Sequence, residues 1–455
     1  MPGFHALAES MARFGTSSLV LALFLPLTLI TRRSVQRFLM ALVILDIPLR
    51  LEHHFGSHES SWELGSFGGL GISVTTLGVA VLYAAWIVES VVGVGRSRPP
   101  LRYDLPLATY VLVSAFSLLV ARDILFGFFE VWILFQTFLV FVYFANKVQS
   151  REDVLFVVRI FLIALVVEST VILGLAAGLR FDIPGHPLVV AEEAVGQYSR
   201  IAGTVSSPNV AAGYLTLLMT PALSLLAAPL GRWDKRLALL AFGSAFVALV
   251  FTFSRGAWTA LLLSLAIMGG VLLRQRRLRL TTLVVFILGI AAIGLILHHQ
   301  IATRLLMDDR GAGNVRFDLM RVAFSMIRDH PLLGVGANNY PLVMGRYYKA
   351  GEWVYSVHDK YLLVGAEIGI LGLLAFLGFL LGTIRRGMRL WRAQDPLISA
   401  LAIGVTAAVI GHMTHLFVDV FRGRVAVQLL WMMAALVVAL SRIEFAPRAT
   451  TIAGR

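Results

Sequence analysis

The sequence predicts an all-α protein that crosses a membrane about twelve times and forms one integral membrane domain over residues 1–455. Two observations lead to this prediction. Of the 455 residues, 58% are hydrophobic and only 14% are charged, whereas soluble domains carry roughly 25% charged residues. The apolar residues also occur in long runs, and a transmembrane helix needs about 20 of them in succession.

The individual spans follow from the length of these runs. The first two runs are short and are separated only by Thr31, Arg32 and Arg33, so we expect either twelve or thirteen transmembrane helices. No signal-peptide cleavage site follows the first run, which indicates a retained anchor. The candidate spans are residues 16–31, 34–51, 70–94, 105–121, 124–145, 154–178, 210–229, 237–253, 257–273, 280–297, 361–384, 396–417 and 425–441.

Arginine and lysine gather in every second connection between these spans, for example around Arg98, Lys147, Arg236, Arg277 and Arg389. This distribution marks cytoplasmic loops. The alternate connections are then external, and the basic C-terminal tail is cytoplasmic. The net charge of +13 is accounted for by membrane topology, so we expect membrane lipids and no nucleic acid as partners.

Several kinds of chemistry have little support in the sequence. The chain contains no cysteine, which excludes disulfides, thiolate nucleophiles and cysteine zinc sites. It has neither a GxxxxGKS/T phosphate loop nor a His, Asp and Glu cluster with the spacing of a metal site. A Ser-His-Asp hydrolase is disfavoured because no serine lies in a nucleophile-elbow context. We therefore expect no metal and no cofactor.

The longest external connection, residues 298–360, can form a helical layer outside the membrane. An amphipathic helix is predicted within it. Phe317 and Phe324 belong to its apolar stripe, and Arg321 and Arg328 are expected on another face. Such a helix would rest on the membrane surface or on the bundle and present its arginines to one side.

A charged cluster marks the external start of the span that follows this loop. His358, Asp359 and Lys360 place an imidazole beside an acid and an amine, which is suitable for proton transfer. The plainer interpretation is a helix start with a surface histidine and a lysine that extends to the interface. The local sequence leaves both interpretations open.

Two external arginines are candidate phosphate ligands. Arg200 lies shortly before a span, and Arg255 lies in the tightest turn of the chain. Paired guanidinium groups bind pyrophosphate through bidentate contacts and stabilise it as a leaving group without a metal. The alternative is that each arginine binds a lipid phosphate at the interface.

Asp419 closes a span on the same external side. It could orient His358 or hold an arginine, or it could be an end-of-helix acid paired with Arg422. Acids inside apolar runs are expected to form internal hydrogen bonds or to pair with arginine rather than to act as catalysts. These acids are Glu130, Glu168 and Glu367.

The most specific motif begins at His358 and continues through Asp359 and nine further residues to Gly369-Ile370-Leu371-Gly372. With this motif the chain resembles the O-antigen ligase and polymerase superfamily of bacterial envelope enzymes. Asp359 departs from the family pattern, which usually has Asn, Ser or Gln at that position. The resemblance spans roughly residues 190–425. Its weaker parts are Arg200 with Ser207-Pro208-Asn209, the turn Ser254-Arg255-Gly256, the segment Arg316–Gly336, and Asp419.

The resemblance implies an inverting glycosyltransferase of the GT-C type in the bacterial inner membrane, with a periplasmic active site. It would move O-antigen polysaccharide from undecaprenyl pyrophosphate to the lipid A core, the last step of lipopolysaccharide assembly. Arg200 and Arg255 would bind the pyrophosphate, and His358 would activate the acceptor hydroxyl. We assign supporting roles to Asp419, Arg321, Arg328, Asp359 and Lys360.

Three alternatives share parts of this prediction. An O-antigen polymerase uses the same donor with a second lipid-linked glycan as acceptor, and a protein O-oligosaccharyltransferase transfers the glycan to protein. A transporter of polysaccharide lipids would favour inverted repeats and spans broken by glycine or proline at mid-membrane, and we find neither in the sequence. The long external loop with arginine and histidine favours an enzyme.

Overall fold

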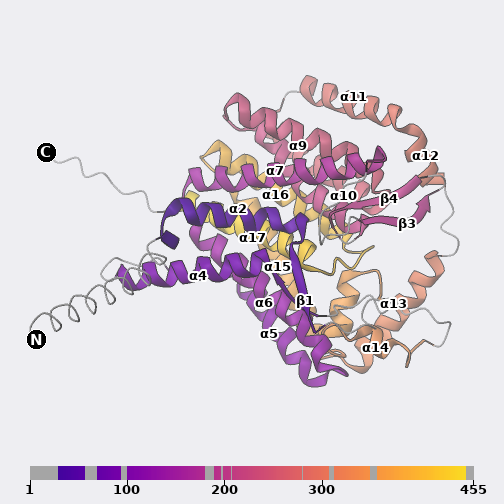
Figure 1. Ribbon diagram of the computed structural model, residues 1–455. Helices are drawn as coiled ribbons and strands as arrows, with labels where there is room; N and C mark the ends of the chain where they lie inside the picture. Colours follow the sequence, from indigo (N-terminus) through magenta and orange to yellow (C-terminus); the bar gives the residue numbers. More distant parts are fainter. Residues whose placement is uncertain are drawn as a thin grey trace, which may run out of the picture.

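The protein is a bundle of long helices with most of its shorter elements gathered at one end, as the computed structural model in Figure 1 shows. The first predicted span, residues 16–31, lies almost entirely outside the described part of the chain. The structure describes residues 29–56, 69–93, 100–179, 189–195, 198–205, 207–278, 280–306, 312–348 and 356–446.

Every other predicted span corresponds to a helix. Within the described residues, eight helices are long and apolar enough to cross a membrane, and a ninth span results if the bent pair Ile287–Ile296 and His298–Leu306 counts as one. The chain is therefore a multi-pass membrane protein. The helices that correspond to the predicted spans are α2 (Arg33–Leu49), α4 (Val74–Val92), α5 (Leu105–Phe116), α6 (Ile124–Lys147), α7 (Arg151–Ala176), α8 (Pro208–Ser224), α9 (Arg232–Phe251), α10 (Arg255–Arg274), α11 (Leu280–Ile296), α15 (Lys360–Leu390), α16 (Pro396–His415) and α17 (Arg424–Glu444).

The shorter elements include two antiparallel hairpins that an all-helical prediction does not anticipate. One hairpin joins α2 to α4, and the other precedes α8. The short elements are β1 (Glu52–Phe55), β2 (Leu70–Ser73), η1 (Ser117–Val120), β3 (Val189–Val195), β4 (Tyr198–Gly203), η2 (Leu225–Ala227), α12 (His298–Leu306), α13 (Ala312–Asp329) and α14 (Tyr340–Met344).

Helices α8, α16 and α17 form the centre of the bundle and bury the largest share of their spans. Glycine lets α16 approach both of its neighbours closely. A Cβ added at Gly404 would lie 2.4 Å from the Ser224 hydroxyl on α8, and one at Gly411 would lie 2.0 Å from the Ser264 hydroxyl on α10. Van der Waals packing of small residues is the main attraction between helices in lipid, so these contacts fix where α8 and α10 stand.

A buried ion pair ties the first described helix to the last. Arg424, at the start of α17, donates to Asp46 of α2 and to Glu52 of β1, each over 2.8 Å. An isolated charge at this depth would be very costly, and mutual pairing removes most of that cost. The N-terminal helices are thereby fixed to the central bundle.

Helix α15 is broken in its first half at Gly369, where φ is +77°. This break is a correction, because the sequence analysis found no span interrupted by glycine. The segment at residues 330–336 lies against the break and takes up its free backbone groups. Ile370 N–H donates to Pro331 O over 2.8 Å, and Val335 N–H donates to Ala366 O over 2.9 Å.

The orientation of α13 differs from the prediction. Phe317 and Phe324 are exposed on the same face as Arg321 and Arg328, while the opposite face is buried against α15. The smaller residues Leu319, Val322, Ala323 and Met326 form that buried face. Residues spaced by three and four share a helix face, so α13 carries two apolar stripes, either of which could pack against α15. The stripe with the smaller side chains is the one that is buried.

We predict that Gly369→Ala destabilises the protein, because an L-residue at positive φ costs about 1–2 kcal/mol and the new Cβ would lie 2.1 Å from Leu332 O. A loss of at least roughly 2 to 4 °C in Tm is expected, measured by thermal unfolding in detergent. Gly382→Ala is the matched control, since that glycine lies in the same helix with nothing within 4 Å of an added Cβ. Equal Tm values for the two variants would contradict this role of Gly369.

Candidate functional site

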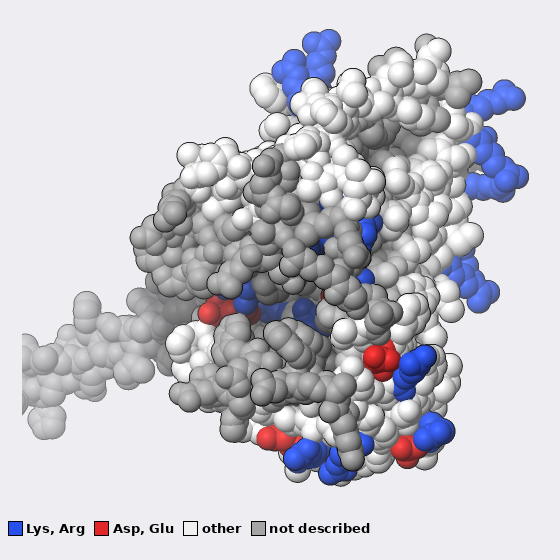
Figure 2. Space-filling model, turned by 90° about the vertical axis from the view of Figure 1, so that its right-hand side faces the viewer, with Lys and Arg blue, Asp and Glu red and all other residues white. Residues whose placement is uncertain are grey.

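The predicted site residues His358, Arg200, Arg255 and Asp419 all lie at one end of the bundle, which we call the His358 end. Helices α8, α10, α15 and α17 begin there, and α9 and α16 end there. Figure 2 shows the molecule from the side of β3, β4 and α13, with basic side chains recessed at its centre and others projecting at the rim.

The turn between α9 and α10 gathers arginines. Its residue Phe253 has a φ of +51°, a left-handed conformation that is rare for a bulky side chain. Arg200 Nε donates to Thr252 O over 3.2 Å, and Arg304 Nε donates to Phe253 O over 2.9 Å. Arg255 follows as the first residue of α10. The carbonyl groups of this turn thus orient the guanidinium groups of Arg200 and Arg304, and Arg255 follows directly in the chain.

Arg200 is held by a second contact. It lies on β4, and its Nη2 donates to the side-chain oxygen of Asn209 over 2.6 Å. Asn209 is in the first turn of α8 and also forms a side-chain hydrogen bond with Asp419. Arg200, Asn209 and Asp419 therefore form a continuous chain across three elements.

Asp419 is buried and interacts electrostatically with both His358 and Arg200. Burial raises the pKa of its carboxyl above the usual range, and the charges of His358 and Arg200 partly offset this. The start of α15 is fixed to the end of α16, because Lys360 N–H donates to Leu416 O over 2.8 Å. That bond places His358, just before α15, close to Asp419, just after α16.

Arg255 lies next to this group because Gly256 permits a close approach. A Cβ added at Gly256 would lie 2.6 Å from a Val418 methyl group and 2.9 Å from the His415 ring. Ser254 Oγ also lies 3.4 Å from His415 Nε2. The start of α10 is thereby pressed against the segment that carries Asp419.

The two residues after His358 have different roles in the structure. Asp359 is the N-cap of α15, and its Oδ1 accepts from Leu362 N–H over 2.9 Å. Burial raises the pKa of this carboxyl, and the capping hydrogen bonds partly lower it. Lys360 is buried and points into the bundle, where it interacts electrostatically with Glu130, so it does not extend to the interface.

The geometry decides between the two interpretations of Asp419. Arg422 pairs with Glu367 of α15 and also donates to Asn338 over 3.3 Å. The same Glu367 carboxylate accepts from Tyr340 N–H over 3.1 Å. Arg422 is thus directed into the bundle, and Asp419 faces His358 and Arg200. The expected arginine partner for a glutamate inside a span is confirmed at Glu367.

Two supporting residues lie apart from this group. Arg321 and Arg328 are exposed on α13 and pair with acids on their own helix, Asp318 and Asp329, each over 3.2 Å. Asn209 and Arg304 contact the site but were not predicted as site residues. Asn209 was named only as part of the resemblance, and Arg304 belonged to no motif.

The chemistry of the site follows from its charges. Among the described residues, the arginines Arg200, Arg255 and Arg304 outnumber the buried acids Asp359 and Asp419 at this end, which suits a polyanion. Within the described residues, no group of three or more His, Asp or Glu side chains could hold a metal ion. The guanidinium groups can neutralise a bound anion, and His358, Asp359 and Asp419 are titratable groups at the same end.

Comparison with known proteins gives one match. Residues 238–377 match the family model described as O-antigen ligase. The matched region runs from α9 into α15 and contains Arg255, His358 and the break at Gly369. Arg200 and Asp419 lie outside it and reach the site through the contacts described above. No curated protein matches the chain.

We predict that Asp419→Asn stabilises the fold. A folded-state pKa raised by burial means that ionisation of Asp419 costs stability, and this cost grows as the pH rises through that pKa. The Tm of Asp419→Asn should exceed that of the wild type by roughly 1 to 2 °C near pH 8, and the gain should shrink near pH 5.

Asp329→Asn, at an exposed position on α13, is the control and should change Tm little at either pH. A lower Tm for Asp419→Asn at both pH values would mean that attraction to His358 and Arg200 outweighs the cost of burial.

Proposed function

We propose that this chain, whose residues 238–377 match the family model described as O-antigen ligase, is a metal-independent, inverting glycosyltransferase. It moves O-antigen polysaccharide from undecaprenyl pyrophosphate to the lipid A core at the periplasmic face of the bacterial inner membrane. The observation that carries the proposal is the meeting of His358, Asp419 and Arg200 beside Arg255 at the His358 end.

In the proposed reaction, an acceptor hydroxyl oxygen attacks the anomeric carbon of the donor sugar. The bond from that carbon to the pyrophosphate oxygen breaks, and the configuration at the carbon inverts. His358 takes the hydroxyl proton as general base. His358 directly precedes Asp359, the N-cap of α15, and its side chain is partly exposed.

Arg200 and Arg255 supply the charge stabilisation. The leaving undecaprenyl pyrophosphate gains negative charge as the bond breaks, and guanidinium groups fixed in advance stabilise that charge without reorganisation. Arg200 is fixed by Thr252 and Asn209. Arg255 is fixed by its place at the start of α10, against the segment that carries Asp419.

Asp419 acts as a positioning residue in this scheme. Its carboxyl interacts with His358 on one side and with Arg200 on the other. An acid beside the imidazole stabilises the imidazolium that forms when the proton is taken. The same acid links the base to the pyrophosphate-binding arginine.

A transporter is less well supported than an enzyme despite the break in α15. In transporters, broken spans line a substrate cavity near the bilayer midplane. Here the break is covered by residues 330–336, and a Cβ added at Gly369 would lie 2.3 Å from the Leu332 carbonyl carbon. The backbone groups released by the break bind this segment, so they are not left for a substrate.

The proposal is tested in the source bacterium by deleting the gene and examining lipopolysaccharide on a gel. Loss of every core-attached chain, restored by the wild-type gene, is expected. A band with a single repeat unit would indicate the polymerase instead. An unchanged ladder would exclude both, and transfer to protein would then be examined.

We predict that His358→Ala reduces transfer by roughly 10²- to 10⁴-fold, because the general base is lost. The assay uses purified protein with lipid-linked donor and lipid A core acceptor. The control is His330→Ala, whose exposed side chain lies outside the site. Transfer by His358→Ala at the wild-type rate and at equal protein level would exclude the assignment.

We predict that Arg255→Lys loses turnover more than donor affinity. Lysine keeps the charge but presents a point donor where a planar pair is needed. The loss in kcat should approach the roughly 10²- to 10³-fold cost of removing one preorganised donor, with KM for the donor changed less. The control is Arg346→Lys, at an exposed position after α14. Unchanged kcat in Arg255→Lys would limit that residue to lipid binding.

A further inference from the structure

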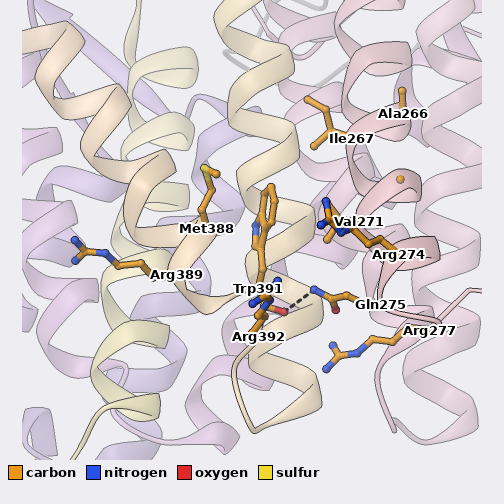
Figure 3. Close-up of a pocket in the computed structure, with 11 residues that line it drawn as sticks. Ala266, Ile267, Val271, Arg274, Gln275, Arg277, Met388, Arg389, Trp391 and Arg392 are labelled. Atoms are coloured by element: carbon orange, nitrogen blue, oxygen red, sulfur yellow. Dashed lines mark hydrogen bonds between the residues drawn. The ribbon is translucent and has the colours of Figure 1, made fainter.

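A large groove lies at the opposite end of the bundle from His358, between the last turns of α10 and α15. Figure 3 shows its lining. Its volume of about 1120 Å³ exceeds the roughly 300–1,000 Å³ of ordinary small-molecule sites. A ligand of that size would contact neither His358 nor Arg255.

The lining of the groove changes from apolar to basic along its length. On α10, Ile267, Gly270, Val271 and Arg274 are spaced by three and four and therefore share one helix face. The apolar members lie deeper in the helix, and Arg274 lies at its end. A ligand that follows this face needs a hydrocarbon part and an anionic part.

The basic part of the groove contains four arginines, and no carboxylate lines it among the described residues. Arg277 is occupied, because its Nη1 donates to Ser399 Oγ over 2.7 Å. Arg274 and Arg392 form no ion pair within the described part of the chain. Like charges in one groove repel each other, and a bound anion removes that repulsion through charge-assisted hydrogen bonds.

Two buried polar atoms in the same lining lack partners. Trp391 Nε1 and Gln275 Oε1 have no hydrogen-bond partner among the described residues, although Gln275 Nε2 donates to Trp391 O over 2.9 Å. Figure 3 shows Trp391 between the arginines of the two helices. An unpaired buried donor is costly, and this one belongs to a residue that lines the basic part of the groove.

We propose that this groove binds an anionic phospholipid of the cytoplasmic leaflet. The phosphate group lies between Arg274 and Arg392, and one acyl chain lies along Ile267 and Val271. The proposal uses the predicted orientation, in which this arginine-rich end faces the cytoplasm. Basic pockets between helices on that side are suited to anionic headgroups.

The position of the groove connects it to the stability of the site. Helices α10 and α15 both pack against α16, and at their other ends they begin with Arg255 and Lys360. A lipid that bridges their last turns would limit how far the two helices move apart. Its binding should therefore raise the Tm of the whole chain, whatever reaction the other end performs.

The experiment measures lipid binding to the full-length, delipidated protein in detergent by native mass spectrometry, with Tm as a second readout. Phosphatidylglycerol is compared with phosphatidylcholine of the same acyl chains. The groove variant is Arg274→Gln/Arg392→Gln. The matched control is Arg276→Gln/Arg385→Gln, which removes the same charge from exposed positions next to the groove.

We expect the wild type and the control to bind phosphatidylglycerol in preference to phosphatidylcholine. The groove variant should bind phosphatidylglycerol roughly tenfold more weakly or worse, since two charge-assisted contacts are lost. Equal weakening in the groove variant and the control, or no preference between the two lipids, would overturn the proposal.

A second variant tests the hydrocarbon half of the groove without changing charge. Gly270→Phe fills open space, because nothing lies within 4 Å of an added Cβ there. It should reduce phosphatidylglycerol binding even if the arginine variant does not fold. Unchanged lipid binding in Gly270→Phe, or a Tm increase with inorganic phosphate equal to that with phosphatidylglycerol, would show a plain anion site and refute a lipid site.

Discussion

The break in α15 imposes the strongest constraint on the structure. Unpaired backbone groups cost several kcal/mol in a bilayer, and the helix loses part of its own ladder at Gly369. The segment at residues 330–336 supplies the missing partners, since Val335 and Gly336 donate to Ala366 and Glu367 and Pro331 accepts from Ile370. The connection between α13 and α15 is thereby joined to a long apolar helix by main-chain hydrogen bonds that do not depend on side chains.

The position of the candidate site follows from this junction. The short half-helix before Gly369 carries Glu367, which holds Arg422 and thus the connection from α16 to α17. That connection presents Asp419, and the same half-helix begins directly after His358 and Asp359. His358 and Asp419, the proposed base and its positioning acid, are therefore both held by one short piece of helix. Catalytic geometry is more reliable on such a support than on a loop.

The sequence predicted what depends on composition and local order. Span positions follow from apolar length, whereas the capping role of Asp359 was not predicted. The sequence also did not predict the break, because Gly369 lies in an unbroken apolar run and only the approach of Leu332 explains its conformation. The orientation of α13 and the role of Arg304 were missed for a similar reason. Both depend on contacts with parts of the chain that are distant in sequence, and the spacing of residues along one segment does not predict such contacts.

Arginine occurs at both ends of the bundle in different surroundings, and this difference separates the two anion sites that we propose. At the His358 end, backbone carbonyls and Asn209 fix the guanidinium directions, and a titratable pair stands beside them. Such preorganisation costs conformational freedom and is useful where charge develops during a reaction. At the opposite end, Arg274 and Arg392 are exposed and keep their rotamer freedom. Flexible cations suit a headgroup that is only bound, because binding needs charge balance but no fixed geometry at a reacting atom.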